Sequence, residues 1–494
     1  MSLTINNSNK IPGLASGLET DAIIQGLLKQ YQAKVDKQSQ KTTKLEWTAE
    51  AYREINAQIK NFRSQYLSVL SDTNMMTGAA YSNFSVNMLT PNGAASVTVS
   101  SSAVAGEYTI NSIQQIATAA SVESKAVFIG EKYDSDSKLS ELQLATALEF
   151  DENGEISFSI NGETFTFDED TTISEMMRKV NNAGVGVIMR FSSLKSGFSL
   201  TADKTGSQSE IHIVNLKGNA FSTEDSALGI AEGIYKGQDA ICTIEGIVVT
   251  QSTNSFSFDG ITYNLTAKTD TPIKFRVEQD YETTADNIIK FIDAYNELID
   301  KLQGKVSEKV YRNFAPLTDA QRKEMKEDEI AKWEERAKSG MLHNAPYIRS
   351  LLSELRSAFS SKPEGLSKGP YDIGLTTGTW QEGGKIKVNR EKLVAALKED
   401  PETVKQLFVQ TGQEGEAGLM IRISDSLLAY TKSSTDIALD SLEDRISQSK
   451  NAVKTLTQRM EEKEKDLWKK YSAMEAALSR LNGLYNWLST LFTA

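Results

Sequence analysis

The chain has 494 residues, with 54 lysines and arginines against 66 aspartates and glutamates, one cysteine and two histidines. This length predicts several domains, and a hydrophobic fraction of 39% is enough to build packed cores. The single cysteine excludes a disulfide framework, and the net charge of -12 argues against a general nucleic-acid binder. The sequence contains no run of about 18 apolar residues, so we expect no membrane-spanning helix.

The N-terminal part predicts a long helix with a narrow apolar stripe. No proline occurs from Thr20 to about Leu70, and apolar residues recur there at intervals of three and four. The stripe residues that we expect to pack in a helical leg are Tyr52, Ile55, Ile59, Phe62 and Tyr66, with Val69 at the end of the pattern. A second apolar cluster, which we expect to mediate assembly, consists of Leu14, Leu18, Ile23, Ile24, Leu27 and Leu28.

The middle of the chain predicts β-structure. Proline is absent between Pro91 and Pro272, and this stretch is rich in threonine, serine, valine, isoleucine and phenylalanine in alternating runs. A helix from about Ile173 to Val180, capped by Thr171 or Thr172, interrupts the strands. The turns that we expect to close hairpins are Asn153-Gly154, Asn161-Gly162 and Asp259-Gly260.

Helices return after the β-rich middle. The predicted helices run from about Thr284 to Leu302, from Thr318 to Lys338 and from Ala345 to Phe359, with a small hairpin near 373–389. Asn389 and Asp400 precede residues that favour a first helical turn, and each is expected to start a helix.

The strongest periodic pattern lies at the C-terminus, where every seventh residue from Leu439 to Leu488 is apolar. A second seam is interrupted at Ser449, Lys463 and Lys470. We expect leg packing at Leu439, Leu442, Ile446, Val453, Leu456 and Met460. We expect contacts between subunits or with a filament at Leu467, Met474, Leu478, Leu481, Leu484 and Leu488.

A helix of this length, roughly 80 Å at 1.5 Å per residue, needs a partner, because a narrow apolar stripe does not offset the entropy of ordering the chain. The sequence therefore predicts a multidomain α+β fold. Both chain ends build a helical, coiled-coil stalk, and mostly-β head domains are inserted between them.

Residues that commonly carry chemistry lack supporting motifs. His212 alternates within a strand pattern, His343 lies in a loop-like stretch, and Cys242 is predicted to be a small core residue. The acidic turn after Asp151 lacks the glutamate that an EF-hand loop requires at its twelfth position. We therefore predict no catalytic residue, no metal site and no cofactor, and a protein that is not an enzyme.

Several motifs in chain order resemble the flagellar filament cap proteins, the FliD or hook-associated protein 2 family. The motifs are Ile11-Pro-Gly-Leu-Ala-Ser-Gly-Leu-Glu-Thr-Asp21, Lys44-Leu-Glu-Trp47, Lys236-Gly-Gln-Asp-Ala-Ile241, Pro316-Leu-Thr-Asp319, Lys332-Trp-Glu-Glu-Arg336 and Tyr471-Ser-Ala-Met-Glu-Ala-Ala-Leu478. Glu19 and Asn389 stand where the family usually or often has aspartate, and both keep the capping chemistry.

This resemblance implies a division of the chain into head and leg domains. The expected parts are an N-terminal export and assembly segment (1–43), an N-terminal leg helix (44–80), an inner β head domain (81–125 with 236–280), an inserted outer β head domain resembling a flagellin motif (126–235), a helical leg domain (281–467) and a C-terminal assembly tail (468–494).

The resemblance also implies a function and partners. It implies a homo-oligomeric cap outside the cell, at the distal tip of the flagellum, which retains exported flagellin and promotes its folding and insertion. The implied partners are further copies of the chain, flagellin, the flagellar type III export machinery, an export chaperone that binds the C-terminus, and the hook-filament junction proteins. Two alternatives stay open: a hook-filament junction protein, and a secreted adhesin whose β head binds a host glycan or mucin.

Overall fold

The computed structural model describes residue 17 and residues 19–90, 93–125, 127–129, 134–378, 383–412 and 415–492. Residues 491 and 492 are described by their backbone only. The chain forms two compact units, of which one is Ser82–Tyr281 and the other combines the chain on both sides of it. Two predicted interface residues, Leu14 and Leu18, lie outside the described residues. The predicted α+β fold class is confirmed, since helices form both ends and strands form the middle.

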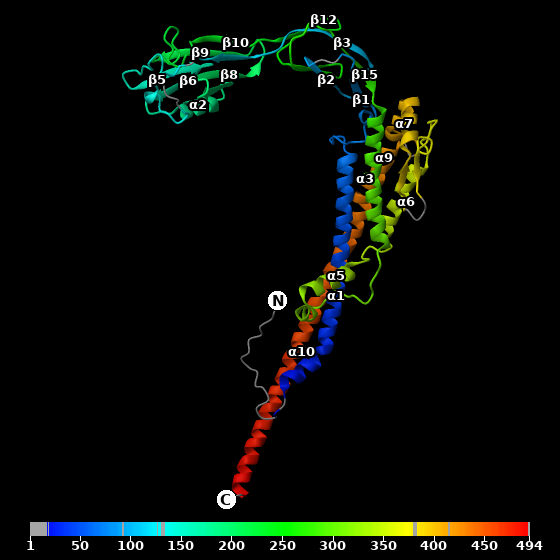
Figure 1. Cartoon of the computed structure of the whole chain (residues 1–494). Helices are drawn as coiled ribbons and strands as arrows, with labels where there is room; N and C mark the ends of the chain where they lie inside the picture. The colour runs from blue at the N-terminus through cyan, green and yellow to red at the C-terminus, as the bar shows by residue number, and fades with distance from the viewer. Residues whose placement is uncertain are drawn as a thin grey trace. The chain divides into compact units, whose positions relative to one another are not determined.

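The helical unit is built from both ends of the chain, and Figure 1 shows α1, in blue, beside α3 and α10. Its helices are α1 (Thr20–Tyr66), η1 (Gly78–Tyr81), α3 (Tyr281–Ser307), α4 (Asp319–Glu324), α5 (Glu327–Lys338), α6 (Pro346–Ser360), α7 (Arg390–Glu399), α8 (Pro401–Val409), α9 (Leu419–Ala429), the π-helical turn η4 (Tyr430–Ser434) and α10 (Thr435–Phe492). The expected hairpin is present as β16 (Leu375–Thr377) paired with β17 (Ile386–Val388).

The first helix ends earlier than the apolar pattern predicts. α1 stops at Tyr66, and Val69, which continues the pattern, is 69% exposed. The hydroxyls of Ser71 and Thr73 both donate to the carbonyl of Gln65, at 2.6 and 2.8 Å. These side chains take over a carbonyl that a continuing helix would satisfy, so the chain turns away here.

The predicted charged helix from Thr318 to Lys338 is wrong as a single element, because it is two helices, α4 and α5. Lys326 lies between them in an extended conformation, with φ -80° and ψ 155°. Its backbone N–H donates to Glu329 Oε2 at 3.1 Å, the reciprocal half of a capping arrangement. The glutamate therefore starts a new helix where the charge pattern alone suggests a continuous one.

The predicted helix caps Thr172, Asn389 and Asp400 are confirmed. Thr172 caps α2 (Ile173–Asn182), because its side-chain hydroxyl accepts from the backbone N–H of Glu175 at 3.2 Å. In return, the Glu175 carboxylate accepts from the backbone N–H of Thr172. Asn389 Oδ1 and Asp400 Oδ1 accept from the third residue of α7 and α8, at 2.8 and 3.0 Å. Each cap satisfies a backbone donor that has no partner inside its helix.

The β-rich unit contains an inner sandwich of two sheets. A five-stranded sheet has the order β1-β15-β3-β11-β12, and a three-stranded sheet has the order β13-β14-β2. The strands are β1 (Phe84–Met88), β2 (Ala95–Val99), β3 (Gly106–Gln115), β11 (Ala240–Ile244), β12 (Ile247–Gln251), β13 (Ser255–Phe258), β14 (Ile261–Leu265) and β15 (Ile273–Gln279). Every pairing is antiparallel, and the core of this sandwich includes Ile110, Phe275 and Cys242.

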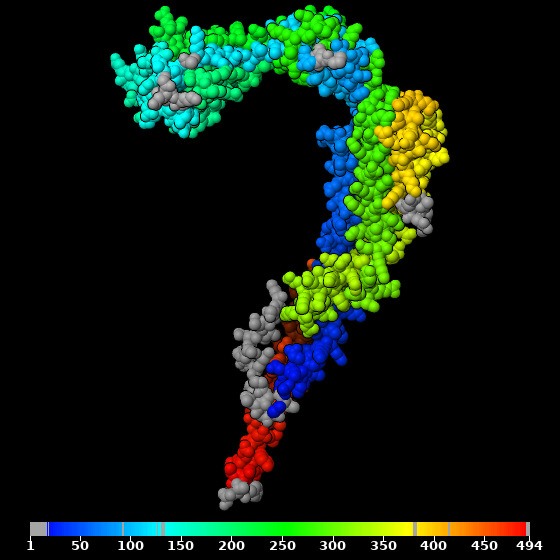
Figure 2. Space-filling view, viewed as in Figure 1, coloured from blue at the N-terminus to red at the C-terminus, as the bar shows by residue number. Residues whose placement is uncertain are grey.

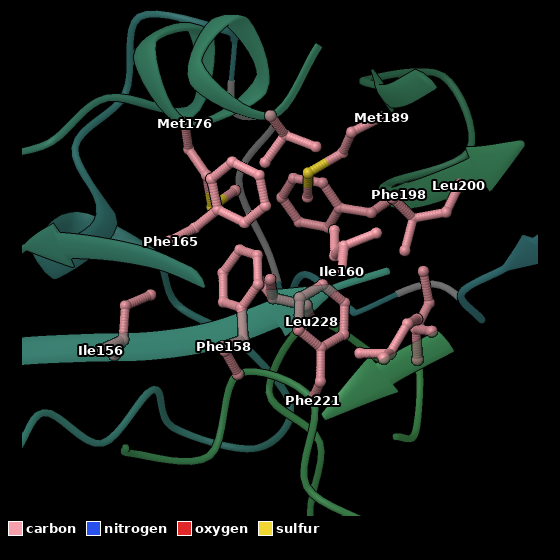
Figure 3. Packing of buried hydrophobic residues seen from close by; sticks show 14 of the residues in the cluster. Ile156, Phe158, Ile160, Phe165, Met176, Met189, Phe198, Leu200, Phe221 and Leu228 are labelled. Atoms are coloured by element: carbon pink, nitrogen blue, oxygen red, sulfur yellow. The ribbon is translucent and has the colours of Figure 1, made fainter. Parts of the chain in front are cut away.

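A second apolar core lies between two further sheets and helix α2. The sheets have the orders β10-β9-β5-β6 and β4-β8-β7. Their strands are β4 (Ala119–Glu123), β5 (Glu155–Ile160), β6 (Glu163–Asp168), β7 (Val187–Ser192), β8 (Gly197–Thr205), β9 (Glu210–Lys217) and β10 (Gly233–Lys236), with the short helix η2 (Leu139–Glu141) before β5. Figure 3 shows Phe158, Phe165, Phe198 and Phe221 pointing toward one another, with Met176 of α2 closing the cluster.

Two of the three predicted hairpin turns are confirmed. Asn161-Gly162 joins β5 to β6 and Asp259-Gly260 joins β13 to β14, each with positive φ at both residues, as the tight hairpin turn requires. Asn153-Gly154 does not close a hairpin, because no strand precedes it; Gly154 N–H instead donates to Asp151 O at 2.9 Å in a turn that leads into β5. A third hairpin turn, at Glu245-Gly246, was not predicted.

Candidate functional site

The two chain ends meet along α1 and α10, which run antiparallel. Arg53 pairs with Glu443 at 2.8 Å, and Glu46 pairs with Lys450 at 2.8 Å, so residue numbers fall along one helix as they rise along the other. All four side chains are between 42% and 60% exposed, and such pairs contribute little to stability. They show the register in which the two helices pack.

A buried polar cluster lies where the heptad pattern is interrupted. Ser449, 4% exposed, accepts from Gln38 Nε2 at 2.7 Å and lies 2.8 Å from Thr42 Oγ1. Thr42 donates in turn to the backbone carbonyl of Gln38 at 3.0 Å. The serine that interrupts the apolar seam is therefore a satisfied contact between α1 and α10, and a shift of one residue would break both bonds to Ser449.

Ser449→Ala should lower the free energy of unfolding by about 1–3 kcal/mol, because the half-buried amide of Gln38 loses its partner and the buried Thr42 hydroxyl loses one of its two bonds. Urea unfolding followed by circular dichroism measures this change. Ser447→Ala, two residues away and exposed, is the matched control and should stay within about 0.5 kcal/mol of the wild type. Equal stability of the two variants would show that the cluster does not hold the register.

The predicted leg-packing residues have different partners along α1. Phe62 and Tyr66 lie against Phe291 of α3, with both ring centroids 5.7 Å away. The other α1 residues of this set, Tyr52, Ile55 and Ile59, are buried. On α10, Leu442 is buried, whereas Leu439, Ile446, Val453, Leu456 and Met460 are half-buried.

Part of the predicted assembly set packs within the chain. Ile24 and Leu28 of α1 form a buried cluster with Leu467 of α10, and Tyr31 and Trp468 pack against it. These three aliphatic side chains are between 1% and 9% exposed. Near its first turn, α1 therefore packs against α10 through side chains that the sequence analysis assigned to contacts with other subunits.

The rest of that set is half-buried or exposed. Ile23, Met474 and Leu478 are half-buried, Leu27 is 48% exposed, and Leu481, Leu484 and Leu488 are 60%, 56% and 46% exposed. Figure 2 shows the red end of α10 continuing past the start of α1. We call residues 479–490 the α10 tail; all of them are exposed.

The α10 tail carries an apolar stripe with helical spacing. Leu481, Leu484, Tyr485 and Leu488 follow intervals of three and four, so they lie on one face of the helix. Sampling every seventh residue finds Leu481 and Leu488 but misses Tyr485, which is 73% exposed, and Trp487, which is 60% exposed. Such a stripe, without a partner among the residues that the structure describes, is typical of an interaction surface.

Residues that could carry chemistry have structural surroundings. Cys242 is 1% exposed, and burial raises the pKa of its thiol to about 11, so the thiol stays protonated at neutral pH. His343 Nδ1 lies 3.0 Å from the backbone carbonyl of Glu308, and His212 lies on strand β9. Among the described residues, none of the three has a side-chain partner that would make it a nucleophile or a general base.

One of the larger surface hollows has no acidic side chain in its lining. The hollow between α3 and α6, about 700 Å³, is lined by Arg349, Arg356 and His343 without a carboxylate. Among the described residues no group of three or more histidine, cysteine or acidic side chains is placed to hold a metal ion. Within the same part of the chain, no helix is long and apolar enough to cross a bilayer.

Family models match most of the chain. The model described as "Flagellar hook-associated protein 2 N-terminus" matches residues 16–120, and "Flagellar hook-associated protein 2 C-terminus" matches residues 237–483, half of the whole chain. This chain belongs to the flagellar hook-associated protein 2 (FliD) family. The family consists of structural proteins of the flagellum and not of enzymes.

Flagellar hook-associated proteins 2 of other bacteria match all or part of this chain. The flagellar hook-associated protein 2 of Halalkalibacterium halodurans is 26% identical, over 98% of this chain and 99% of its own length. That of Thermotoga maritima is 26% identical over 67% of this chain and 54% of its own length. The crystal structure of the D1-D2-D3 domains of the Escherichia coli flagellar cap protein FliD shares the fold, with a TM-score of 0.52, 20% identity, and coverage of 80% of this chain and 99% of that one. Neither alternative, a junction protein or an adhesin, gains support from these matches.

Proposed function

We propose that this chain caps the distal end of the flagellar filament as a homo-oligomer, where it retains exported flagellin and promotes its folding and insertion. The observation that carries this proposal is the similarity to a hook-associated protein 2 over 98% of the chain. The fold shared with a flagellar cap protein supports it, and so does the leg made from both chain ends.

We propose that the exposed residues of the predicted assembly set contact other subunits or the filament. They are Leu27, Leu481, Leu484 and Leu488, together with the half-buried Ile23, Met474 and Leu478. Ile24, Leu28 and Leu467 have a different role in this proposal, because they hold α1 against α10. They keep the leg together and leave the α10 tail free to meet a partner.

The proposed domain division has support from the packing. One buried cluster lies within residues 94–117 and 240–277, and another within residues 120–230, in agreement with an inner and an inserted outer head domain.

We further propose export by the flagellar type III route, with a chaperone covering the α10 tail before assembly. The tail suits a chaperone because an exposed apolar stripe invites aggregation until it is covered. Contact with the hook-filament junction proteins during assembly completes the proposal.

Deleting the gene in the source bacterium tests the function. The mutant should release flagellin into the medium and bear short filaments or none, and the full chain supplied on a plasmid should restore filament length in electron micrographs. Gold-labelled antibody against the chain should mark the free end of the filament. Label at the boundary between hook and filament would favour a junction protein instead, and normal filaments in the mutant would contradict the proposal.

A further inference from the structure

Edge strands in the two β sandwiches differ in charge. An edge strand exposes unpaired backbone groups, and monomeric proteins commonly protect it with charged residues or proline. The outer sandwich follows this rule at all four edges: Glu163 and Asp168 lie on β6, Lys236 on β10, Arg190 on β7 and Glu123 on β4. Lys179 Nζ also donates to the carbonyl of Thr166 on β6, at 3.0 Å.

The edge strands of the inner sandwich do not follow this rule. Its four edge strands, β1, β2, β12 and β13, contain neither a charged residue nor a proline. The charges lie on central strands instead, as with Lys274, Arg276 and Glu278 on β15 and Glu107 on β3. A sheet that keeps its charges away from its edges lacks the usual barrier to pairing with another strand.

Strand β12 is the most open of these edges. Ile247 and Val248 are 68% and 65% exposed, and β12 pairs only with β11. The two-residue turn at Glu245-Gly246 sets the hydrogen-bonding pattern, so the N–H and C=O groups of Val248 and Thr250 point away from β11. β12 therefore presents an apolar edge whose backbone groups are ready to bond.

Strand β1, at the opposite edge of the same sheet, also has backbone N–H and C=O groups that point away from its neighbouring strand. Bonds from Asp280 N–H to Asn83 O and from Leu89 N–H to Lys274 O fix the alternation along β1. The backbone groups of Phe84, Val86 and Met88 consequently point away from β15. Since each neighbouring pair in this five-stranded sheet is antiparallel, β1 and β12 run in the same direction.

We propose that, in the assembled protein, β12 of one copy pairs with β1 of a second copy, which continues the inner sheet from subunit to subunit. This rests on the proposed homo-oligomeric cap, because a ring repeats one contact between two different surfaces. Copies with a net charge of -12 repel one another, and a contact between two uncharged edges avoids adding to that repulsion. A β12–β12 contact would join two copies only and would leave β1 unpaired.

Cysteine pairs in the full chain test this contact. Val248→Cys is combined with Ser85→Cys, and separately with Asn87→Cys, because these three residues are exposed on the side of the sheet away from the core. Native Cys242 is buried and stays as background. Mild oxidation, of the purified protein and of isolated filaments, should give a ladder of dimers, trimers and larger species in at least one double variant. Val248→Cys alone should stay monomeric on a non-reducing gel.

The matched control places cysteines at the two charged edges of the outer sheet, Thr164→Cys on β6 with Ile234→Cys on β10, and should give at least tenfold less ladder. Dimers from Val248→Cys alone would overturn the proposal in favour of a two-fold contact. No ladder from either double variant would overturn it as well. If the wild-type chain still restores filaments in that case, the cap function stands and only the edge pairing is wrong.

A charged residue placed on strand β12 tests the proposed strand pairing independently. Val248→Lys should weaken self-association at least tenfold in sedimentation experiments, whereas Val248→Thr, which keeps a β-branched side chain, should associate like the wild type. Circular dichroism confirms that both variants fold. Unchanged association of the lysine variant would overturn the proposal.

Discussion

Replacing three leucines of the α10 tail by glutamine should abolish capping and leave the protein folded. The change is Leu481→Gln with Leu484→Gln and Leu488→Gln. Each leucine would lose about 1.5–3 kcal/mol of burial against a partner, while the chain loses little because these side chains are already between 46% and 60% exposed. Glutamine keeps the helical propensity. Filament length in complemented cells and the unfolding midpoint of the purified protein measure the two effects.

The opposite face of the same helix supplies the control. Ser479→Gln with Asn486→Gln and Thr490→Gln makes as many changes over the same turns, about half a turn away from the stripe. This variant should restore filaments as the wild type does. If the leucine variant also restores them, or if its unfolding midpoint falls, the stripe is a packing surface of the chain itself and not a docking surface.

Phe158→Ala should destabilise the outer sandwich by about 3–5 kcal/mol. Phe158 is fully buried in the outer core, in edge-to-face contact with Phe221 (Figure 3) at 4.7 Å between ring centroids. The ring centroid of Phe167 lies 5.6 Å from that of Phe158. Truncation leaves a cavity that β5 and β6 cannot close without breaking their ladder. Hydrogen exchange of the β5 amides, followed by mass spectrometry, measures the loss.

The inner sandwich should keep its protection in this variant, because its core is a separate cluster. Phe258→Ala on β13 is the control: this side chain is 42% exposed, and its removal should cost less than about 1 kcal/mol. Faster exchange in both sandwiches of the Phe158→Ala variant would show that the two fold as one cooperative unit, in disagreement with the proposed domain division.

Local patterns were enough to predict most elements of this fold. The apolar stripe of α3, from Ile288 to Leu302, and the seven-residue repeat of α10 identify helices because burial repeats at helical spacing. Caps such as Thr172 and turns such as Asn161-Gly162 depend on residues that are neighbours in sequence. Where a local bond competes with the pattern, as with Glu329 at Lys326, prediction from periodicity fails.

The register of the leg and the availability of its apolar residues needed the folded chain. Ser449 interrupts a seam in the sequence, yet it is a hydrogen-bonded contact because Gln38 and Thr42 reach it from the other end of the chain. Ile24 and Leu481 both belong to apolar helical patterns, but Ile24 packs against Leu467, whereas Leu481 is 60% exposed.

The sequence by itself determined the order of helices and strands, the absence of motifs for catalysis, and the family to which the chain is similar, because each depends on residue types and spacings along the chain. Only the tertiary structure decided which apolar residues remain exposed and which strands lie at sheet edges. Burial and edge position depend on contacts between segments far apart in sequence, and local spacing does not specify those contacts. The uncharged edges of the inner sandwich and the open stripe of the α10 tail became visible for that reason.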